Sequence, residues 1–213
     1  MEKIAIVDYG MSNLHSVTSA LNAVSNDQQM VEVCQRPEDI DNADRVIFPG
    51  QGAAADCMQQ INDYRLVSAL KKAAQEKPFL GICMGMQVLL DHSQENDGTE
   101  CLGMVQGSVQ KFDQDMSIEG SRLKVPHMGW NQIHQRIDHP LWHGIAQDSY
   151  FYFVHSYYVE LEQAKKAAGR TYYGIEFTSV LAQDYIFAMQ CHPEKSADNG
   201  LQLLKNFLNW SVK

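Results

Sequence analysis

The sequence predicts an α/β fold whose central sheet is mostly parallel, with antiparallel strands added to it. In the first half of the 213-residue chain, short apolar runs alternate with helical patterns. In the second half, β-rich runs are separated by turn residues, and one helical pattern closes the chain. Alternation of strand and helix is typical of a parallel sheet with helices on its faces, whereas closely spaced strands favour antiparallel hairpins.

Hydrophobic periodicity predicts the elements of the first half. Apolar runs bounded by turn residues predict strands, and apolar residues at helical spacing predict helices. The expected elements are strand 3–7, helix 14–24, strand 30–34, strand 45–48, one or two helices over 53–75, strand 79–82 and helix 85–92.

Short β-rich runs predict the strands of the second half. Segment 197–210 has leucines and Phe207 at helical spacing, so we expect a helix that Ser196 or Asp198 caps. No repeat or linker separates the halves, and residues 1–213 are expected to form a single domain. The strands are expected over 103–112, 130–134, 150–154, 157–160, 173–177, 180–183 and 187–190.

The composition argues against several classes of protein. Hydrophobic residues make up 45% of the chain, but no apolar run approaches the roughly 20 residues of a membrane-spanning helix. The net charge of −9, without a cluster of Lys or Arg, argues against nucleic-acid binding. The beginning of the chain is typical of a first strand rather than of a signal peptide. Five cysteines without paired spacing favour free thiols in a reducing cytoplasm.

The segment Gly81-Ile82-Cys83-Met84-Gly85 says most about function. A strand pattern precedes it and a helical pattern follows, which is the layout of a nucleophile elbow, a sharp turn that exposes the side chain at its tip. Glycines are expected beside such a turn because a Cβ would collide there. A helix N-terminus beneath the sulfur favours the thiolate, so Cys83 is the candidate nucleophile. The alternative is a small buried hydrophobic residue, as most cysteines of cytosolic domains are.

A second segment, Gln190-Cys191-His192-Pro193-Glu194, carries the groups that activate a nucleophile. It follows a strand, and the carboxyl ends of parallel strands meet at one edge of a sheet, where ligands bind. The proline favours an extended backbone, so Glu194 is expected to reach one imidazole nitrogen while the other faces the thiol. The sequence thus predicts a triad of Cys83, His192 and Glu194. Taken alone, a histidine at the end of a strand is more often a surface or half-buried residue than a catalytic one.

A third segment, Phe48-Pro49-Gly50-Gln51-Gly52, directly follows a strand. Glycines there allow backbone amides to turn toward a developing oxyanion. An ordinary strand-to-helix turn explains the same residues equally well.

Neither a metal nor a cofactor is expected. His139 and His143 are four residues apart, but the segment lacks the glutamate of a zinc-protease helix and a third ligand. We interpret this segment as a turn.

Taken together, these segments resemble the class I glutamine amidotransferases, which implies their flavodoxin-like three-layer fold. Within that family, the chain is similar to the glutaminase subunits of imidazole glycerol phosphate synthase along nearly its whole length. The matching segments are Gly81-Ile82-Cys83-Met84-Gly85-Met86-Gln87, Val7-Asp8-Tyr9-Gly10-Met11-Ser12-Asn13-Leu14, Pro49-Gly50-Gln51-Gly52, Pro126-His127-Met128-Gly129-Trp130-Asn131, Tyr152-Phe153-Val154-His155-Ser156-Tyr157-Tyr158 and His192-Pro193-Glu194-Lys195-Ser196.

The resemblance implies a role for each matching residue. Cys83 attacks the side-chain carboxamide of glutamine, His192 activates the thiol and protonates the departing ammonia, and Glu194 orients His192. Water then cleaves the thioester and releases glutamate. The backbone amides of Gly52 and Met84 are the implied oxyanion donors, and Gln87, Glu95, His155, Ser156 and Tyr157 match positions that hold the glutamine.

The resemblance also implies a partner. The chain has no Gly-rich phosphate loop for a phosphorylated acceptor, so the acceptor is expected on a cyclase subunit of (βα)₈-barrel fold whose core conducts the ammonia. The expected assembly is a heterodimer. The implied interface consists of Asn13, Met128, Trp130 and Lys195. Alternatively, Trp130 is an ordinary packing residue and Lys195 is a solvated charge.

Three residues depart from the family pattern: Ser12 stands for glycine, Gln51 for valine and Cys191 for an aromatic residue. These departures leave other functions open. The chain could be a duplicated subunit that supplies ammonia for the amidation of surface sugars, or a non-catalytic scaffold that keeps the fold. The triad alone would also suit a cysteine peptidase.

Overall fold

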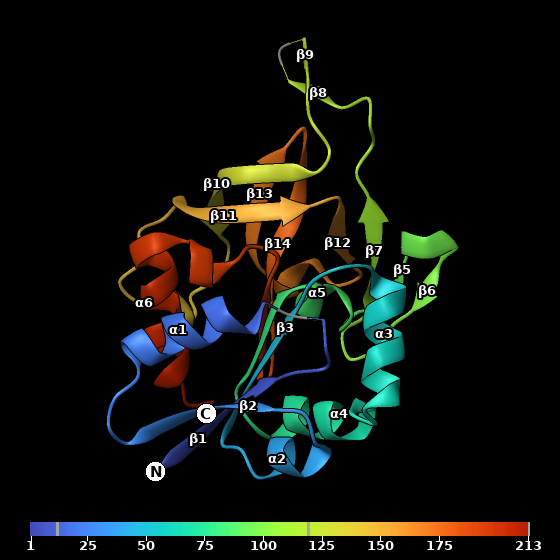
Figure 1. Cartoon of the computed structure of the whole chain (residues 1–213). Coiled ribbons are helices and arrows are strands. Elements are labelled where there is room, and N and C mark those ends of the chain that lie inside the picture. The colour runs from blue at the N-terminus through green and yellow to red at the C-terminus, as the bar shows by residue number, and fades with distance from the viewer. Residues whose placement is uncertain (12, 119, 213) are drawn as a thin grey trace.

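The computed structural model describes residues 1–11, 13–118 and 120–212, so Ser12 lies outside the described residues. One sheet of 13 strands runs through both halves of the chain (Figure 1). Its first part consists of five parallel strands, each hydrogen-bonded to the next. In spatial order they are β2 (Gln29–Cys34), β1 (Glu2–Val7), β3 (Arg45–Gly50), β4 (Phe79–Cys83) and β15 (Ile186–Met189).

Beyond β15 the strands pair antiparallel, except that β5 pairs parallel with β7, which confirms the expected mixture of parallel and antiparallel pairing. The strand next to β15 pairs antiparallel with it, and two two-residue strands form the far edge. In order, these strands are β14 (Ile175–Gln183), β12 (Tyr157–Leu161), β7 (Gly107–Lys111), β5 (His92–Ser93) and β6 (Thr99–Glu100).

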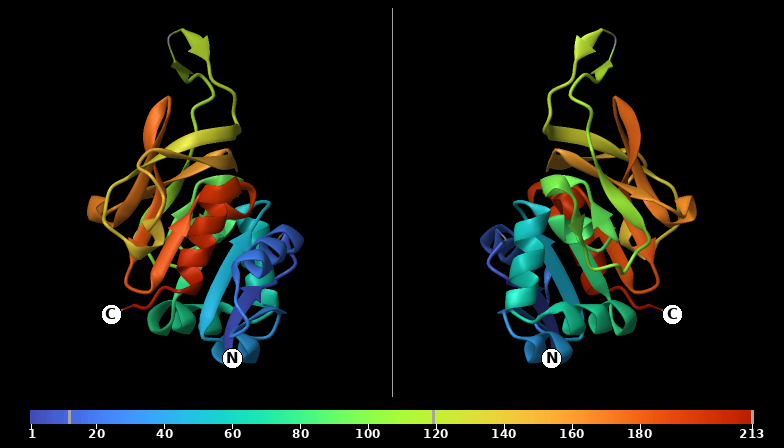
Figure 2. Two further views of the ribbon diagram at one scale, coloured as in Figure 1. Left: turned by 90° about the vertical axis from the view of Figure 1, so that its left-hand side faces the viewer. Right: turned by 90° about the vertical axis from the view of Figure 1, so that its right-hand side faces the viewer.

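Three further strands branch from β14: β13 (Ala167–Tyr173), β10 (His127–Gln135) and β11 (Ser149–His155). They lie above the carboxyl ends of the parallel strands (Figure 1). A separate hairpin of β8 (Ser117–Ile118) and β9 (Ser121–Arg122) projects from the body of the molecule, at the end opposite to the two termini (Figure 2).

Helices cover both faces of the parallel strands and give three layers (Figures 1 and 2). One face carries α1 (Leu14–Val24) and α6 (Ala197–Leu208), and the other carries α2 (Pro37–Asp41), α3 (Ala54–Asp63) and α4 (Val67–Glu76). Successive strand residues point to opposite faces. Ile47 therefore packs in the core with α1 and α6, whereas Val46 and Phe48 pack with α3 and α4. No described helix is long and apolar enough to cross a membrane.

Several boundaries differ from expectation. The helix expected over 85–92 is one turn, α5 (Met84–Gln87), after which the chain leaves the helix. The strand expected over 173–177 crosses a hairpin, because Gly174 turns the chain with φ +74° between β13 and β14. The hydroxyl of Ser196 does not cap α6; it donates to the His192 carbonyl at 2.6 Å. The two-residue strands, α2 and the 3₁₀ turn η3 (Ala164–Lys166) are too short to show a periodicity.

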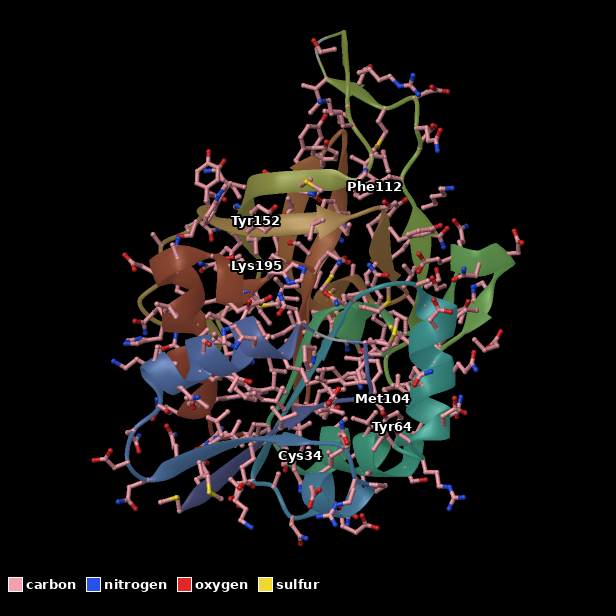
Figure 3. The ribbon with its side chains drawn as sticks, in the orientation of Figure 1. Cys34, Tyr64, Met104, Phe112, Tyr152 and Lys195 are labelled. Carbon is pink, nitrogen blue, oxygen red and sulfur yellow. The ribbon has the colours of Figure 1, made fainter. Side chains whose placement is uncertain are left out.

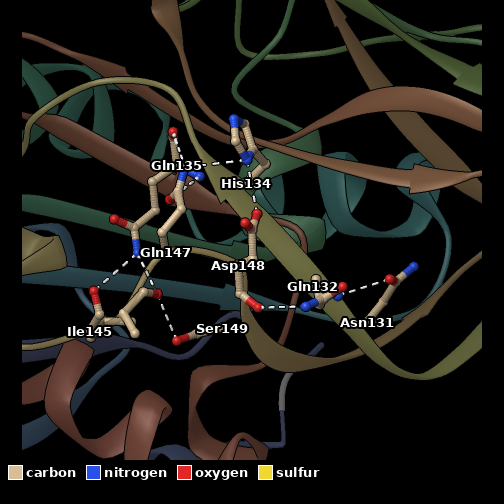
Figure 4. A network of polar contacts seen from close by, with 9 residues as sticks. Asn131, Gln132, His134, Gln135, Ile145, Gln147, Asp148 and Ser149 are labelled. Atoms are coloured by element: carbon tan, nitrogen blue, oxygen red, sulfur yellow. Dashed lines mark hydrogen bonds and ion pairs between the residues drawn. The ribbon is translucent and has the colours of Figure 1, made fainter.

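Polar side chains hold the far ends of β10 and β11 together (Figure 4). His134 Nδ1 and Asp148 Oδ1 are 2.8 Å apart, and the Gln147 side chain donates to the Gln135 carbonyl at 3.1 Å. Along the rest of the pair, His127 lies opposite His155 and Trp130 opposite Tyr152. This register places the His127 and His155 side chains next to each other on one face of the strand pair.

Candidate active site

Cys83 stands at the sharp turn between β4 and α5. Its backbone has φ 56° and ψ −113°, a region that a non-glycine residue rarely adopts. The glycines beside it are tightly enclosed: a methyl group on Gly85 would collide with the Phe48 carbonyl oxygen, and one on Gly81 would lie 2.9 Å from the Ala188 methyl. The turn thus requires glycine on both sides of the cysteine.

His192 and Glu194 follow β15, which lies parallel to β4. Both chain segments therefore leave the sheet at the same edge. His192 Nδ1 is 2.8 Å from Glu194 Oε1, and the Glu194 side chain is 2% exposed. The residues after His192 form the 3₁₀ turn η4 (Pro193–Lys195) rather than the extended segment that we expected. This turn, and not strand alternation, brings the carboxylate to the imidazole.

The charge of His192 depends on its two acidic neighbours. Burial by itself lowers the pKa of His192, but Cys83 and Glu194 outweigh burial and raise that pKa to about 10. The Cys83 sulfur is therefore close enough to the His192 ring to raise its pKa. His192 Nε2 is buried, and no described residue forms a hydrogen bond of good geometry with it. The two neighbours thus favour the protonated form of His192.

A cavity of about 400 Å³ opens over the elbow. Its lining brings together all five residues that were expected to hold a substrate, the two expected oxyanion residues, Cys83, His192 and Lys195. Glu194 contacts His192 from behind the cavity, and Asn13, Met128 and Trp130 do not line it. The lining residues are Gln51, Gly52, Cys83, Met84, Gln87, Glu95, Pro126, Val154, His155, Ser156, Tyr157, His192 and Lys195.

The loop after β3 forms one wall of this cavity. Gly52 has φ +90°, and the Gln51 amide donates to the Met11 carbonyl at 2.8 Å. That amide is therefore engaged outside the cavity. Beside this loop, Glu95 in the 3₁₀ turn η1 (Glu95–Asp97) accepts from the Ala54 amide at 2.8 Å, and burial raises the pKa of Glu95.

The outer face of β10 is apolar beside the cavity. Met128 is 62% exposed and Trp130 is 52% exposed, and the Trp130 ring contacts Tyr152 on β11. Figure 3 shows Lys195 just below Tyr152. Asn13 is exposed at the start of α1. A second cavity of about 660 Å³ lies between Met128 and the β8–β9 hairpin and shares Pro126 with the first one.

The predicted turn at His139 is a short 3₁₀ turn, η2 (Pro140–Trp142). His139 Nδ1 accepts from the Leu141 amide, and the ring packs against Phe187 and Trp210. Within the described ranges, no three His, Cys, Asp or Glu side chains form a group that could hold a metal ion.

The model of the family "Glutamine amidotransferase class-I" matches residues 5–210. The chain belongs to this family. It is 56% identical over 208 residues to the imidazole glycerol phosphate synthase subunit HisH of Hydrogenovibrio crunogenus, a match that covers 98% of the chain and 96% of that relative. It is 50% identical over 210 residues to the HisH subunit of Pseudomonas putida, covering 99% of the chain and 98% of the relative.

Solved structures share the fold of this chain. PurLQS from Thermotoga maritima aligns with a TM-score of 0.72 at 15% identity and covers 98% of both chains. A second solved structure, described as a glutamine amidotransferase, aligns with a TM-score of 0.71 at 14% identity, over 96% of this chain and 97% of that one. The amidotransferase fold expected from the resemblance is thereby confirmed.

Sequence reasoning missed several residues at this candidate site. Pro126 and Val154 line the cavity without carrying a reactive group. Gln190 and His127 are buried polar residues beside it. Gln190 belongs to the segment that contains the His-Pro-Glu motif. The only feature of the sequence that pointed to Gln190 was a polar side chain at the end of an apolar strand.

Proposed function

We propose that the chain is the glutaminase subunit of an imidazole glycerol phosphate synthase and releases ammonia from glutamine for histidine biosynthesis. The observation that carries this proposal is an identity of 48–56% to HisH subunits along almost the entire length of both chains. The cavity that holds Cys83 and His192 supports it, since these are the groups that amide hydrolysis by a thiol requires.

Cys83 is the proposed nucleophile. Its sulfur forms a bond to the side-chain carboxamide carbon of glutamine, and the electron pair of the C=O bond moves to the oxygen. His192 holds the proton that leaves the thiol, and Glu194 stabilises the resulting imidazolium from the other side. Because a neutral amide is a poor electrophile, the developing oxyanion must also be stabilised.

The proposed oxyanion donors are the backbone amides of Gly52 and Met84, which both line the cavity. Met84 is the first residue of α5, where backbone N–H groups have no helical acceptor. The neighbouring Gln51 amide is bound to the Met11 carbonyl in this conformation and contributes nothing to the oxyanion site.

Collapse of the tetrahedral intermediate breaks the C–N bond. His192 returns its proton to the leaving nitrogen, so neutral ammonia departs and a thioester remains on Cys83. Water then attacks the thioester with His192 as the general base, which releases glutamate and restores the thiol. Neutral ammonia is the nucleophilic form, and it must reach its acceptor before bulk water protonates it.

Five residues of the lining are proposed to hold the glutamine: Gln87, Glu95, His155, Ser156 and Tyr157. The Glu95 carboxylate suits the α-ammonium group of a free amino acid. Gln87 Oε1 is buried and accepts no hydrogen bond from a described residue, so it is available to a donor on the substrate. These side chains come from α5, η1 and the turn between β11 and β12.

The proposed partner is a cyclase subunit of (βα)₈-barrel fold that joins the chain in a cytoplasmic heterodimer. The exposed Met128 and Trp130 lie beside the active cavity, and an aromatic residue next to a cavity mouth is a common anchor at interfaces. We propose that Asn13 and Lys195 complete this face. Docking there would cover the cavity and let ammonia pass into the partner.

The test measures glutamate release by the chain alone and in complex with the cyclase subunit. Replacing Cys83 with Ala is expected to lower turnover by at least about a thousand-fold, because no other group can form the thioester. Full activity without the partner would contradict the coupling. Residual turnover close to wild type would remove Cys83 from its role, and failure to restore growth of a histidine auxotroph would contradict the pathway.

A further inference from the structure

Gln190 is a fully buried residue in direct contact with the sulfur of Cys83. It follows β15, and its backbone amide donates to the Ser179 carbonyl at 2.8 Å. Its side-chain Nε2 donates to Cys83 Sγ at 3.7 Å, which is within reach for a hydrogen bond to sulfur. Its Oε1 accepts from Gln87 Nε2 at 2.8 Å. A buried amide that bridges two polar groups in this way is held in one place.

The orientation of the Gln190 amide follows from its neighbours. Gln87 Nε2 lies 2.8 Å from Gln190 Oε1 and 3.2 Å from the Tyr157 carbonyl oxygen. A backbone carbonyl can only accept, so Gln87 must present its nitrogen to this carbonyl. Both protons of that nitrogen are then used, and Gln190 must turn its oxygen toward Gln87. Its nitrogen consequently faces Cys83, and the sulfur receives a donor rather than an acceptor.

The Tyr157 carbonyl is itself fixed by a pair of buried histidines. His155 Nδ1 lies 2.7 Å from this oxygen, and His155 Nε2 lies 2.9 Å from His127 Nδ1. Because the carbonyl can only accept, His155 carries its proton on Nδ1 and accepts through Nε2. His127 must therefore donate from Nδ1.

The other end of the histidine pair requires the same polarity. Asn131 Oδ1 accepts from the Gln132 amide and Asn131 Nδ2 donates to the Tyr172 carbonyl, which fixes the orientation of the Asn131 side chain. Asn131 Nδ2 lies 3.2 Å from His127 Nε2, so that ring nitrogen accepts. Neutral His127 is thus protonated on Nδ1, in agreement with the direction deduced from Tyr157.

Burial keeps this chain of hydrogen bonds in one state near neutral pH. Burial lowers the pKa of His127 to about 4, and burial, together with smaller effects, lowers the pKa of His155 to about 3. A proton on either ring would place two donors against each other. The hydrogen bonds that begin at Asn131 on β10 therefore end at the Tyr157 carbonyl oxygen, which also accepts from Gln87.

We propose that Gln190 donates a hydrogen bond to the Cys83 thiolate and stabilises the reactive form of the nucleophile, with its orientation set by Gln87 and the Tyr157 carbonyl. This inference rests on the proposed function, in which Cys83 forms the thioester. A thiolate gains more from a donor than a thiol does, because hydrogen bonds to a charged group are the stronger ones. Gln190 is accordingly assigned a role beside His192, and the His127–His155 pair holds the Tyr157 carbonyl that orients Gln87.

Other titratable groups also face the sulfur. His192, backed by Glu194, and Cys191 approach it from the segment after β15, and Cys57 approaches it from α3. A substitution at Gln190 changes none of these groups, so its effect on the titration of the sulfur can be separated from theirs.

The experiment measures the rate at which iodoacetamide modifies Cys83 across a range of pH, by mass spectrometry of the Cys83 peptide, in the full chain bound to the cyclase subunit. Gln190→Met keeps the length of the side chain and removes the donor. The pH at half-maximal reactivity is expected to rise by about one unit, in line with the loss of one hydrogen bond to a charged group. The rate of glutamate release at neutral pH is expected to fall with it.

Gln163→Met is the matched control, because Gln163 also donates to a glutamine, Gln106, at 2.9 Å but lies on the exposed surface. It should leave the midpoint unchanged. An unchanged midpoint in folded Gln190→Met overturns the inference, while loss of turnover in Cys83→Ala would still uphold the proposed function. If Gln190→Met does not fold, Gln190→Leu, which also removes the donor and adds no titratable group, must raise the midpoint as well.

Nitrogen NMR of the imidazole rings tests the orientation independently in the wild-type chain. His127 and His155 are both expected as neutral rings protonated on Nδ1. A ring of His155 protonated on Nε2 would contradict its hydrogen bond to the Tyr157 carbonyl and overturn the inferred support of this carbonyl by the His127–His155 pair.

Discussion

Glu194 is the residue whose role is separated most cleanly from substrate binding. It is buried behind His192 and does not line the cavity. Its carboxylate contributes to the raised pKa of His192, so it influences the reaction through the charge and orientation of that ring. A carboxylate at this place is useful because an imidazolium forms each time the thiol loses its proton.

Glu194→Gln keeps the shape of the side chain and removes its charge. We expect kcat for glutamate release to fall by about a hundred-fold or more and KM to change little, because general-base catalysis is impaired and the cavity is not. The pKa of His192 should fall as well, which NMR titration can measure. Glu38→Gln, on the exposed start of α2, is the control. An unaltered kcat in the Glu194 variant would contradict the role.

At the scale of elements, the elbow depends on the close approach of α5 to β3. Gly85→Ala places a methyl group against the Phe48 carbonyl, which belongs to the backbone and cannot move aside. We expect the free energy of unfolding to fall by at least about 2 kcal/mol, measured by urea denaturation. Gly120→Ala meets nothing within 4 Å and carries only the strain of its φ of +79°, which costs about 1 kcal/mol. Equal losses in the two variants would argue against a tight elbow.

Strand β10 has two functions in this account. Its inward residues His127 and Asn131 belong to the hydrogen-bond chain of the active site, and its outward residues Met128 and Trp130 form the proposed docking face. Strand alternation places these two sets on opposite sides of one backbone. A movement of β10 on docking would therefore reach the His127–His155 pair directly.

Trp130→Ala is expected to weaken binding of the cyclase subunit by about 2 kcal/mol, or roughly thirty-fold, because aromatic anchors carry much of the energy of an interface. Isothermal titration calorimetry measures this. Stability of the free chain should hardly change, since Trp130 is 52% exposed. Val33→Ala, an exposed apolar residue on the edge strand β2, should bind the cyclase like the wild type. Unchanged affinity of the Trp130 variant would place the interface elsewhere.

At the scale of the whole molecule, the buried His127 and His155 and the half-buried His139 link stability to pH. Burial lowers the pKa of His127 and His139 from 6.5 to about 4 and that of His155 to about 3. Below about pH 6.5 the unfolded chain binds protons that the folded chain does not. The contribution of these three histidines to the free energy of unfolding is therefore complete above pH 6.5 and is lost as the pH falls toward 4. His192, with its raised pKa, contributes below 6.5 and loses its contribution as the pH rises toward 10.

The free energy of unfolding is thus expected to fall between pH 7 and pH 5, by up to about 1.4 kcal/mol per pH unit for each buried neutral histidine. Urea denaturation at several pH values measures the slope. His139→Phe retains the packing against Phe187 and Trp210 and removes one titrating group. The free energy of unfolding of this variant should therefore depend less steeply on pH, by the equivalent of one bound proton. A slope identical to that of the wild type would show that His139 does not titrate in this way.

Much of the molecule was accessible from the sequence alone. Periodicity predicted the parallel strands and the bounds of α1, because each buried face repeats along a short stretch of chain. Gly81, Cys83 and Gly85 predicted the elbow, since the steric demand of that turn lies within five residues. The nucleophile, the histidine and the carboxylate were likewise proposed from local patterns and from resemblance.

Only the tertiary structure decided how distant groups meet. Cys83 and Gln190 are 107 positions apart, and His127 and His155 are 28 apart, so their contacts depend on strand order and on the register of β10 with β11. A 3₁₀ turn at Pro193 stands where we expected an extended segment, and this turn brings Glu194 back onto His192. Local patterns determine which residues are available to this chemistry, whereas the direction of each hydrogen bond depends on acceptors that other strands bring into place.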